Sequence, residues 1–113
     1  MDLGLKERDD SVTGGGAGIG GAISLALATE GAVPVVFARR MPEEGFLRDL
    51  KALQPKATIV LADLSKDDDC RRAVAEAQAA FGRIDGLVNN AGTNDGVGLD
   101  AGPEAFRRSL DQN

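Results

Sequence analysis

Between residues 13 and 20 the sequence reads TGGGAGIG, and this glycine-rich stretch limits the possible folds more than any other segment. Glycine has no Cβ, so the stretch can adopt positive φ angles and lets a ligand approach its backbone amides closely. The first turn of a helix presents unpaired N–H groups and the positive end of its dipole to the loop before it. A helical apolar pattern starts at once, formed by Ile19, Ala22, Ile23, Ala26 and Leu27. The segment therefore predicts a loop that binds a phosphate or pyrophosphate.

Strand and helix patterns alternate along the rest of the chain. The expected strands are residues 33–38, 57–62 and 84–88, with one more strand before the glycine loop and helices between the strands and after Pro103. Gly31 and Gly82 stand where helices end, and Ser65 with Asp68 resembles a capping box. This alternation gives right-handed crossovers and a parallel sheet. We therefore expect one α/β domain over residues 1–113, a doubly wound parallel sheet of about four strands and their helices.

Two aspartates, Asp9 and Asp10, occupy the place where the first strand is expected. Aspartate is rare in strands, and central parallel strands are normally continuous apolar runs. An aspartate buried without a partner costs several kcal/mol or shifts its pKa. A chain that folds poorly and binds nothing is therefore one alternative, and the exposed edge of a four-stranded sheet also favours it.

The composition excludes several classes of function. The net charge of −5 argues against nucleic acid or an anionic membrane as a partner, and no apolar run is long enough to cross a bilayer. The absence of histidine excludes Ser-His-Asp and Cys-His catalysis and the usual zinc sites, so we expect no metal in this chain. The single cysteine, Cys70, cannot form an internal disulfide, which is typical of a cytoplasmic protein.

Unusual loops follow each of the expected strands, at residues 14–20, 38–40, 63–64 and 89–92. Ligands of parallel α/β sheets bind at the carboxyl ends of the strands, so we expect these loops to meet around one ligand. The glycine loop fits G-x-G-x-x-G from Gly16 and also T-G-x-x-x-G-x-G from Thr13. Either register implies a dinucleotide whose pyrophosphate lies on a helix N-terminus.

Asn89-Asn90-Ala91-Gly92, at the end of the fourth expected strand, decides between these registers. Together with T-G-x-x-x-G-x-G and the Asp63-Leu64 pair after the third strand, it resembles the short-chain dehydrogenase/reductase family. The resemblance spans nearly the whole chain and implies a Rossmann-type NAD(P)-binding domain, the N-terminal portion of a single-domain enzyme. It also implies hydride transfer between a nicotinamide and an alcohol or carbonyl carbon, in a protein that is usually a homo-oligomer.

The resemblance implies cofactor contacts in each of these motifs. The pyrophosphate and the adenosine ribose would be surrounded by Gly14, Gly18, Ile19 and Gly20. Asp63 would accept a hydrogen bond from the exocyclic amine of adenine, with Leu64 beside it, whereas the alternative for Asp63 is a helix-capping carboxylate. The residues along the cofactor ribose and the nicotinamide would be Asn90, Ala91 and Gly92.

The choice of cofactor depends on the residues after the second expected strand. An acidic residue there hydrogen-bonds the ribose 2′-hydroxyl of NAD, whereas an arginine suits the 2′-phosphate of NADP. Ala38 stands where the family's NAD-selective aspartate would be, and Arg39 and Arg40 follow it. We expect NADP to be preferred over NAD, with Arg39 binding the phosphate and Arg40 assisting. The alternative is that both arginines are solvated loop residues.

The family's catalytic tyrosine and lysine, in a Y-x-x-x-K motif preceded by a serine, belong downstream of these residues, and the chain contains no tyrosine. Asn113 falls in the helix where the family's catalytic asparagine stands. We therefore expect a cofactor-binding portion that catalyses no turnover by itself. The alternatives are a non-catalytic dinucleotide-binding or regulatory domain and an inactive truncated product.

A closer resemblance, to bacterial sugar dehydrogenases of the L-fucose dehydrogenase kind, rests on residues 35–39 and 94–100. It implies a small alcohol or sugar as substrate. Asn94 and Asp95 are the candidates here for contacting that substrate, and an Asn-Asp-Gly turn is the alternative for them.

Overall fold

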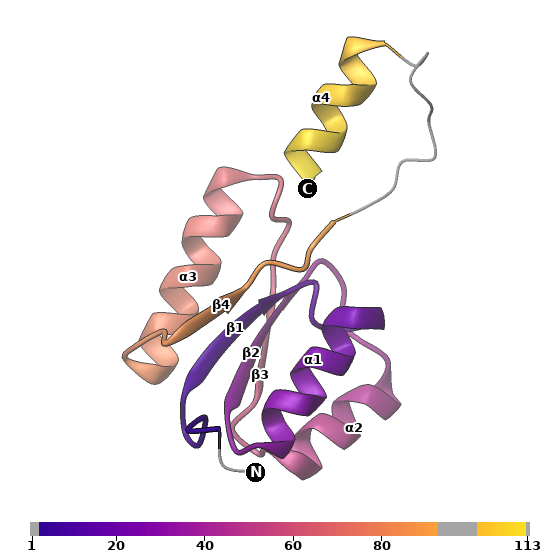
Figure 1. Ribbon diagram of the computed structural model, residues 1–113. Helices are drawn as coiled ribbons and strands as arrows, with labels where there is room; N and C mark the ends of the chain where they lie inside the picture. Colours follow the sequence, from indigo (N-terminus) through magenta and orange to yellow (C-terminus); the bar gives the residue numbers. More distant parts are fainter. Residues whose placement is uncertain (1–2, 93–101, 113) are drawn as a thin grey trace.

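A computed structural model describes residues 3–92 and 102–112 of the chain (Figure 1). Strands and helices alternate in the order β1 (Asp9–Thr13), α1 (Gly18–Thr29), β2 (Val33–Ala38), α2 (Glu44–Leu53), β3 (Thr58–Leu61), α3 (Asp67–Phe81), β4 (Gly86–Val88) and α4 (Pro103–Gln112). β2 has the bounds expected from the sequence, and β3 and β4 are shorter than expected. Within the described ranges, no helix is both long and apolar enough to span a lipid bilayer.

The four strands form one parallel sheet in the order β3-β2-β1-β4. Successive residues of β2 alternate between its two faces. On one face Val36 packs with Ala28 of α1 and Leu50 of α2, and on the other Val35 packs with Ala77 of α3. Figure 1 accordingly shows α1 and α2 on one side of the sheet and α3 on the other. The predicted doubly wound α/β sheet is therefore confirmed.

The buried face of α1 differs from the predicted one. Three residues of the expected apolar stripe are exposed, namely Ile19, Ala22 and Ala26. The helix instead packs on the sheet through its small residues, Gly20, Gly21, Ser24 and Ala28. Small side chains let the helix approach the sheet closely, and this approach brings the first turn of α1 against the end of β1.

Glycine ends two of the helices, as predicted. Gly31 has φ +85° and Gly82 has φ +75°, the left-handed conformation that commonly follows a helix C-terminus. The capping box predicted from Ser65 and Asp68 is wrong, because the N-cap residue of α3 is Lys66 and makes no side-chain cap hydrogen bond. The Ser65 hydroxyl donates instead to Asp63 Oδ1 over 2.6 Å, within a tight turn before the helix.

β1 forms although Asp9 and Asp10 lie in it with their side chains buried. Each carboxylate has an arginine partner: Arg83 Nε lies 3.7 Å from Asp9 Oδ2, and Arg8 Nη2 lies 3.6 Å from Asp10 Oδ1. Gly86 of the neighbouring strand β4 leaves room for the Asp10 carboxylate, since a Cβ at that position would collide with it. The expected conflict is thus relieved in part, by the neighbouring Arg8 and by two residues far away in the sequence, Arg83 and Gly86.

Desolvation raises the pKa of both Asp9 and Asp10 above the usual value for aspartate, more strongly than the arginines lower it. Asp10 Oδ2 is buried and has no hydrogen-bond partner among the described residues. Because the folded-state pKa is raised, ionisation of these groups opposes folding. Their contribution to stability is complete below the unfolded pKa of 3.8 and is lost as the pH rises through the folded pKa.

We predict that Asp10→Asn raises the free energy of unfolding at neutral pH by about 1–2 kcal/mol, because a neutral amide avoids burying a charge. The gain should shrink in acid, where the wild-type carboxyl is protonated as well. Denaturant unfolding followed by circular dichroism at neutral and acidic pH measures both quantities. Asp49→Asn, at an exposed position of α2, is the matched control. A variant that is less stable than wild type at neutral pH would contradict the prediction.

Candidate functional site

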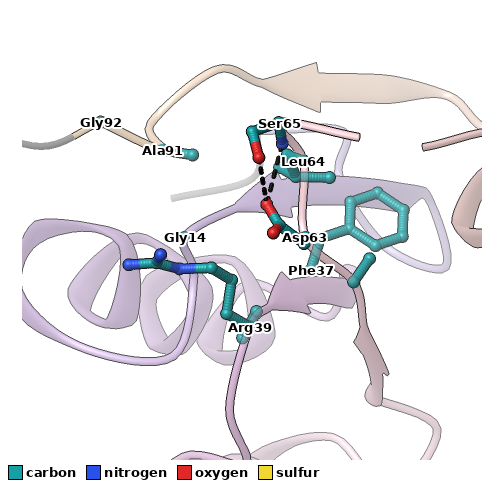
Figure 2. Close-up of a pocket in the computed structure, with 10 residues that line it drawn as sticks. Gly14, Phe37, Arg39, Asp63, Leu64, Ser65, Ala91 and Gly92 are labelled. Atoms are coloured by element: carbon teal, nitrogen blue, oxygen red, sulfur yellow. Dashed lines mark hydrogen bonds between the residues drawn. The ribbon is translucent and has the colours of Figure 1, made fainter. Parts of the chain in front are cut away.

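The loops at the carboxyl ends of β1, β2, β3 and β4 meet around one cleft (Figure 2). Its cavity has a volume of about 170 Å³. The residues that line it are Gly14, Phe37, Ala38, Arg39, Ala62, Asp63, Leu64, Ser65, Ala91 and Gly92. The unusual loops therefore gather at one edge of the sheet, as the alternation of strands and helices predicts.

The glycine loop lies against the ends of β2 and β4. Gly14 has φ +63°, donates its N–H to the Phe37 carbonyl over 2.9 Å, and accepts from Asn90 Nδ2 over 3.2 Å. A Cβ at Gly20 would collide with the Gly14 carbonyl and with the Asn90 amide. Gly18 also has a positive φ, +56°, and there a Cβ would meet no described atom within 4 Å. The loop is thus tightly packed at Gly20, on the side of Asn90, and open at Gly18.

Two hydroxyl groups hold this loop and the neighbouring strand end in place. Thr13 Oγ1 donates to the Val88 carbonyl over 3.2 Å and accepts from the N–H groups of Asn90 and Ala91, each over 2.9 Å. Ser24, fully buried in α1, has its hydroxyl 3.0 Å from the carbonyls of both Gly15 and Gly20. Neither role was predicted from the sequence, although Thr13 begins the T-G-x-x-x-G-x-G motif.

The carboxylate of Asp63 faces the cleft from the turn after β3 (Figure 2). Its Oδ1 accepts from the Ser65 hydroxyl over 2.6 Å and from the Ser65 N–H over 3.0 Å. These bonds lower the pKa of Asp63 below the usual value for aspartate, with smaller contributions from Lys66 and Arg39. Because Lys66 is the N-cap residue of α3, Asp63 is not its helix cap. Its Oδ2 makes no hydrogen bond to any described residue.

Arg39 lines both the cleft and a wider groove between the glycine loop and the start of α2. The groove has a volume of about 1000 Å³, and Arg40, Met41 and Phe46 also line it. Arg39 and Arg40 are exposed, and neither makes a hydrogen bond or ion pair with the described part of the chain. Figure 2 shows the Arg39 guanidinium pointing away from the Asp63 carboxylate. Two unpaired cationic groups therefore stand at the mouth of the groove.

The structure places the predicted cofactor residues in three ways. Those that line the cavity are Gly14, Arg39, Asp63, Leu64, Ala91 and Gly92. Gly18 lines the groove, whereas Gly20 and Asn90 support the glycine loop from beneath. Ile19, the second residue of α1, is 77% exposed and lines neither space. Outside the described residues lie Asn94, Asp95 and Asn113.

Comparison with known families agrees with this geometry. The sequence model of the family described as short chain dehydrogenase matches residues 11–113. This chain belongs to the short-chain dehydrogenase family. The match begins within β1 and takes in every element of the cleft.

Individual relatives agree with the family assignment. The crystal structure of Cj0485 dehydrogenase matches with a TM-score of 0.93 and 34% identity, over 100% of this chain and 44% of that protein. The NADH-dependent reductase A1-R′, crystallised with NAD, matches with a TM-score of 0.88 and 32% identity, over 99% of this chain and 48% of that protein. The NADPH-dependent aldehyde reductase 1, chloroplastic, of Arabidopsis thaliana is 39% identical over 95 residues, which are 77% of this chain and 33% of that protein. The chain thus spans less than half the length of each of these relatives.

We predict that Gly20→Ala lowers the free energy of unfolding by about 1–3 kcal/mol, because its methyl group would push apart the Gly14 carbonyl and the Asn90 amide. Gly45→Ala is the matched control, since the nearest atom to a Cβ in that helix is Arg48 Nη2 at 3.8 Å. The control should be neutral or slightly stabilising, because alanine favours helices. Thermal unfolding of both variants measures the difference, and equal effects would refute the packing argument.

Proposed function

We propose that the cleft binds an NAD(P) cofactor and that the protein is an oxidoreductase. The observation that carries this proposal is the glycine loop at the N-terminus of α1 facing the same cleft as the Asp63 carboxylate. The first turn of α1 contains no acidic residue, so its N–H groups and dipole are available to a pyrophosphate. The open space in front of Gly18 fits such a group. The cofactor would thus be held by the residues 14–20 loop, including the backbones of Ile19 and Gly20.

In this proposal the adenine lies in the cavity between the turn after β3 and the end of β4. Asp63 Oδ2 accepts a hydrogen bond from the exocyclic amine, and Leu64 contacts the ring. The lowered pKa of Asp63 supports this role, because the carboxyl stays ionised and remains an acceptor. Asn90, Ala91 and Gly92 would lie along the cofactor ribose and the nicotinamide, and the nicotinamide supplies the chemistry by accepting or donating a hydride.

NADP is the preferred cofactor in this proposal, with NAD as the second candidate. The relatives include both NADH-dependent and NADPH-dependent enzymes, so the family alone leaves the choice open. The unpaired Arg39 and Arg40 at the mouth of the groove favour NADP, because a guanidinium can form two charge-assisted hydrogen bonds with a phosphate. Ala38, the last residue of β2, offers no carboxylate to a ribose hydroxyl.

We predict that Arg39→Ala weakens NADP binding by about tenfold or more and leaves NAD binding within about twofold of wild type, because one charge-assisted contact is lost. Isothermal titration of the chain with each dinucleotide measures the two affinities. Arg48→Ala, an exposed arginine of α2, controls for the loss of one positive charge. Equal loss of both cofactors would refute the assignment of Arg39.

The substrate in this proposal is a small alcohol or carbonyl compound, and a sugar is one candidate because residues 35–39 and 94–100 resemble those of L-fucose dehydrogenase-like enzymes. Asn113 would take the place of the family's catalytic asparagine. We also propose that the full-length protein is a homo-oligomer and that it is located in the cytoplasm.

We predict that the 113 residues bind the cofactor without turnover, because they contain no tyrosine to serve as the family's proton donor. Purified chain should form no NADPH above background from NADP with L-fucose, glucose or simple alcohols. Binding without turnover also fits a non-catalytic dinucleotide-binding domain. Steady formation of NADPH by the chain would overturn this prediction.

A further inference from the structure

The turn that carries Asp63 and Leu64 is held from one side by the first two turns of α3. Asp69 Oδ2 accepts from the Asp63 N–H over 2.8 Å. Arg72 Nη2 donates to the Leu61 carbonyl over 2.7 Å. Two side chains of the helix therefore fix the backbone on either side of Ala62, the residue that joins β3 to this turn.

The contact from Asp69 acts on the peptide nitrogen of Asp63 itself. It limits rotation about φ of Asp63 and so sets the direction in which the carboxylate leaves the backbone. A hydrogen bond to an ionised acceptor is shorter and stronger than one between neutral groups. Ser65 then holds Oδ1 of Asp63 through two hydrogen bonds, and Oδ2 of Asp63 faces the cleft.

Arg72 links this contact to the end of the strand. Its Nη2 donates to the Leu61 carbonyl and also lies 3.9 Å from Asp69 Oδ2. Its Nη1 donates to Glu76 Oε1 over 2.9 Å. The side chains of Arg72 and Asp69 are 45% and 34% exposed, and solvent screening makes such surface pairs weak contributors to folding stability. Their geometry thus matters more for where the turn lies than for whether the chain folds.

We propose that Asp69 and Arg72 are positioning residues that set the selectivity of the cleft for adenine. This inference rests on the proposed function, in which Asp63 Oδ2 accepts from the exocyclic amine of adenine. Loss of the Asp69 acceptor frees the Asp63 peptide, so Oδ2 no longer stays where the amine can reach it. Selectivity should fall, since hydrogen bonds weaken steeply with poor angles.

The test compares two dinucleotides on the same protein. NAD carries the exocyclic amine, and nicotinamide hypoxanthine dinucleotide carries an oxygen in its place. The dissociation constant of the hypoxanthine dinucleotide divided by that of NAD measures recognition of the amine. This ratio does not depend on the fraction of a variant that is folded. We expect Asp69→Ala to lower this ratio at least threefold and Arg72→Met to lower it in the same direction by less. Asp69→Asn keeps an oxygen acceptor and should restore most of the ratio.

Two controls separate positioning from general effects. Asp68→Ala removes the same charge from the first turn of α3, at an exposed residue that makes no hydrogen bond or ion pair with the turn, and should leave the ratio unchanged. Glu76→Gln weakens the other partner of Arg72 and should also leave it unchanged. A structural role alone would lower the melting temperature of Asp69→Ala without changing the ratio.

The outcomes for this inference and for the proposed function differ. If wild type prefers NAD and Asp63→Ala abolishes the preference, but Asp69→Ala keeps it, the positioning role is refuted and the proposed function stands. If wild type shows no preference, or Asp63→Ala keeps it, the proposed contact between Asp63 and adenine fails, and this inference fails with it.

Discussion

The cleft depends on the close approach between the glycine loop and the end of β4. Asn90 Nδ2 bonds the Gly14 carbonyl, and Thr13 Oγ1 receives the N–H groups of Asn90 and Ala91. These contacts join residues 76 to 78 positions apart in the sequence, so they exist only when β1 and β4 are paired. Gly20 permits them because it places no side chain between the two segments. The contacts that shape the site therefore form only together with the pairing of β1 and β4.

The parts of this arrangement that local chemistry determines could be predicted from the sequence. The valines of β2 favour a strand through their own branched side chains, and Gly31 and Gly82 end helices through their own backbone conformation. The buried face of α1 could not be predicted in this way. Gly20, Gly21 and Ser24 carry almost no apolar signal, yet their small size decides which side of the helix reaches the sheet.

Side chains with several partners in reach were the other source of error. Ser65 could bond the helix N-terminus or the carboxylate two residues before it, and the shape of the turn decides for the latter. The arginine that offsets Asp9 lies 74 positions further along the chain, and the glycine that makes room for Asp10 lies on another strand. Such compensation has no local pattern. It also means that the strand leading into the glycine loop begins with two buried carboxylates, whose desolvation the arginines offset only in part.

The contact between Arg72 and the Leu61 carbonyl has a consequence beyond the cleft. Ala62 N–H bonds Ala38 on β2, so the next residue back, Leu61, directs its carbonyl to the outer border of the sheet. Lys51 likewise donates to the carbonyl of Ala57 at the opposite end of the same border. An intruding strand from another molecule would have to displace two charged donors before it could pair there. Cationic side chains thus protect β3 against aggregation through its open backbone.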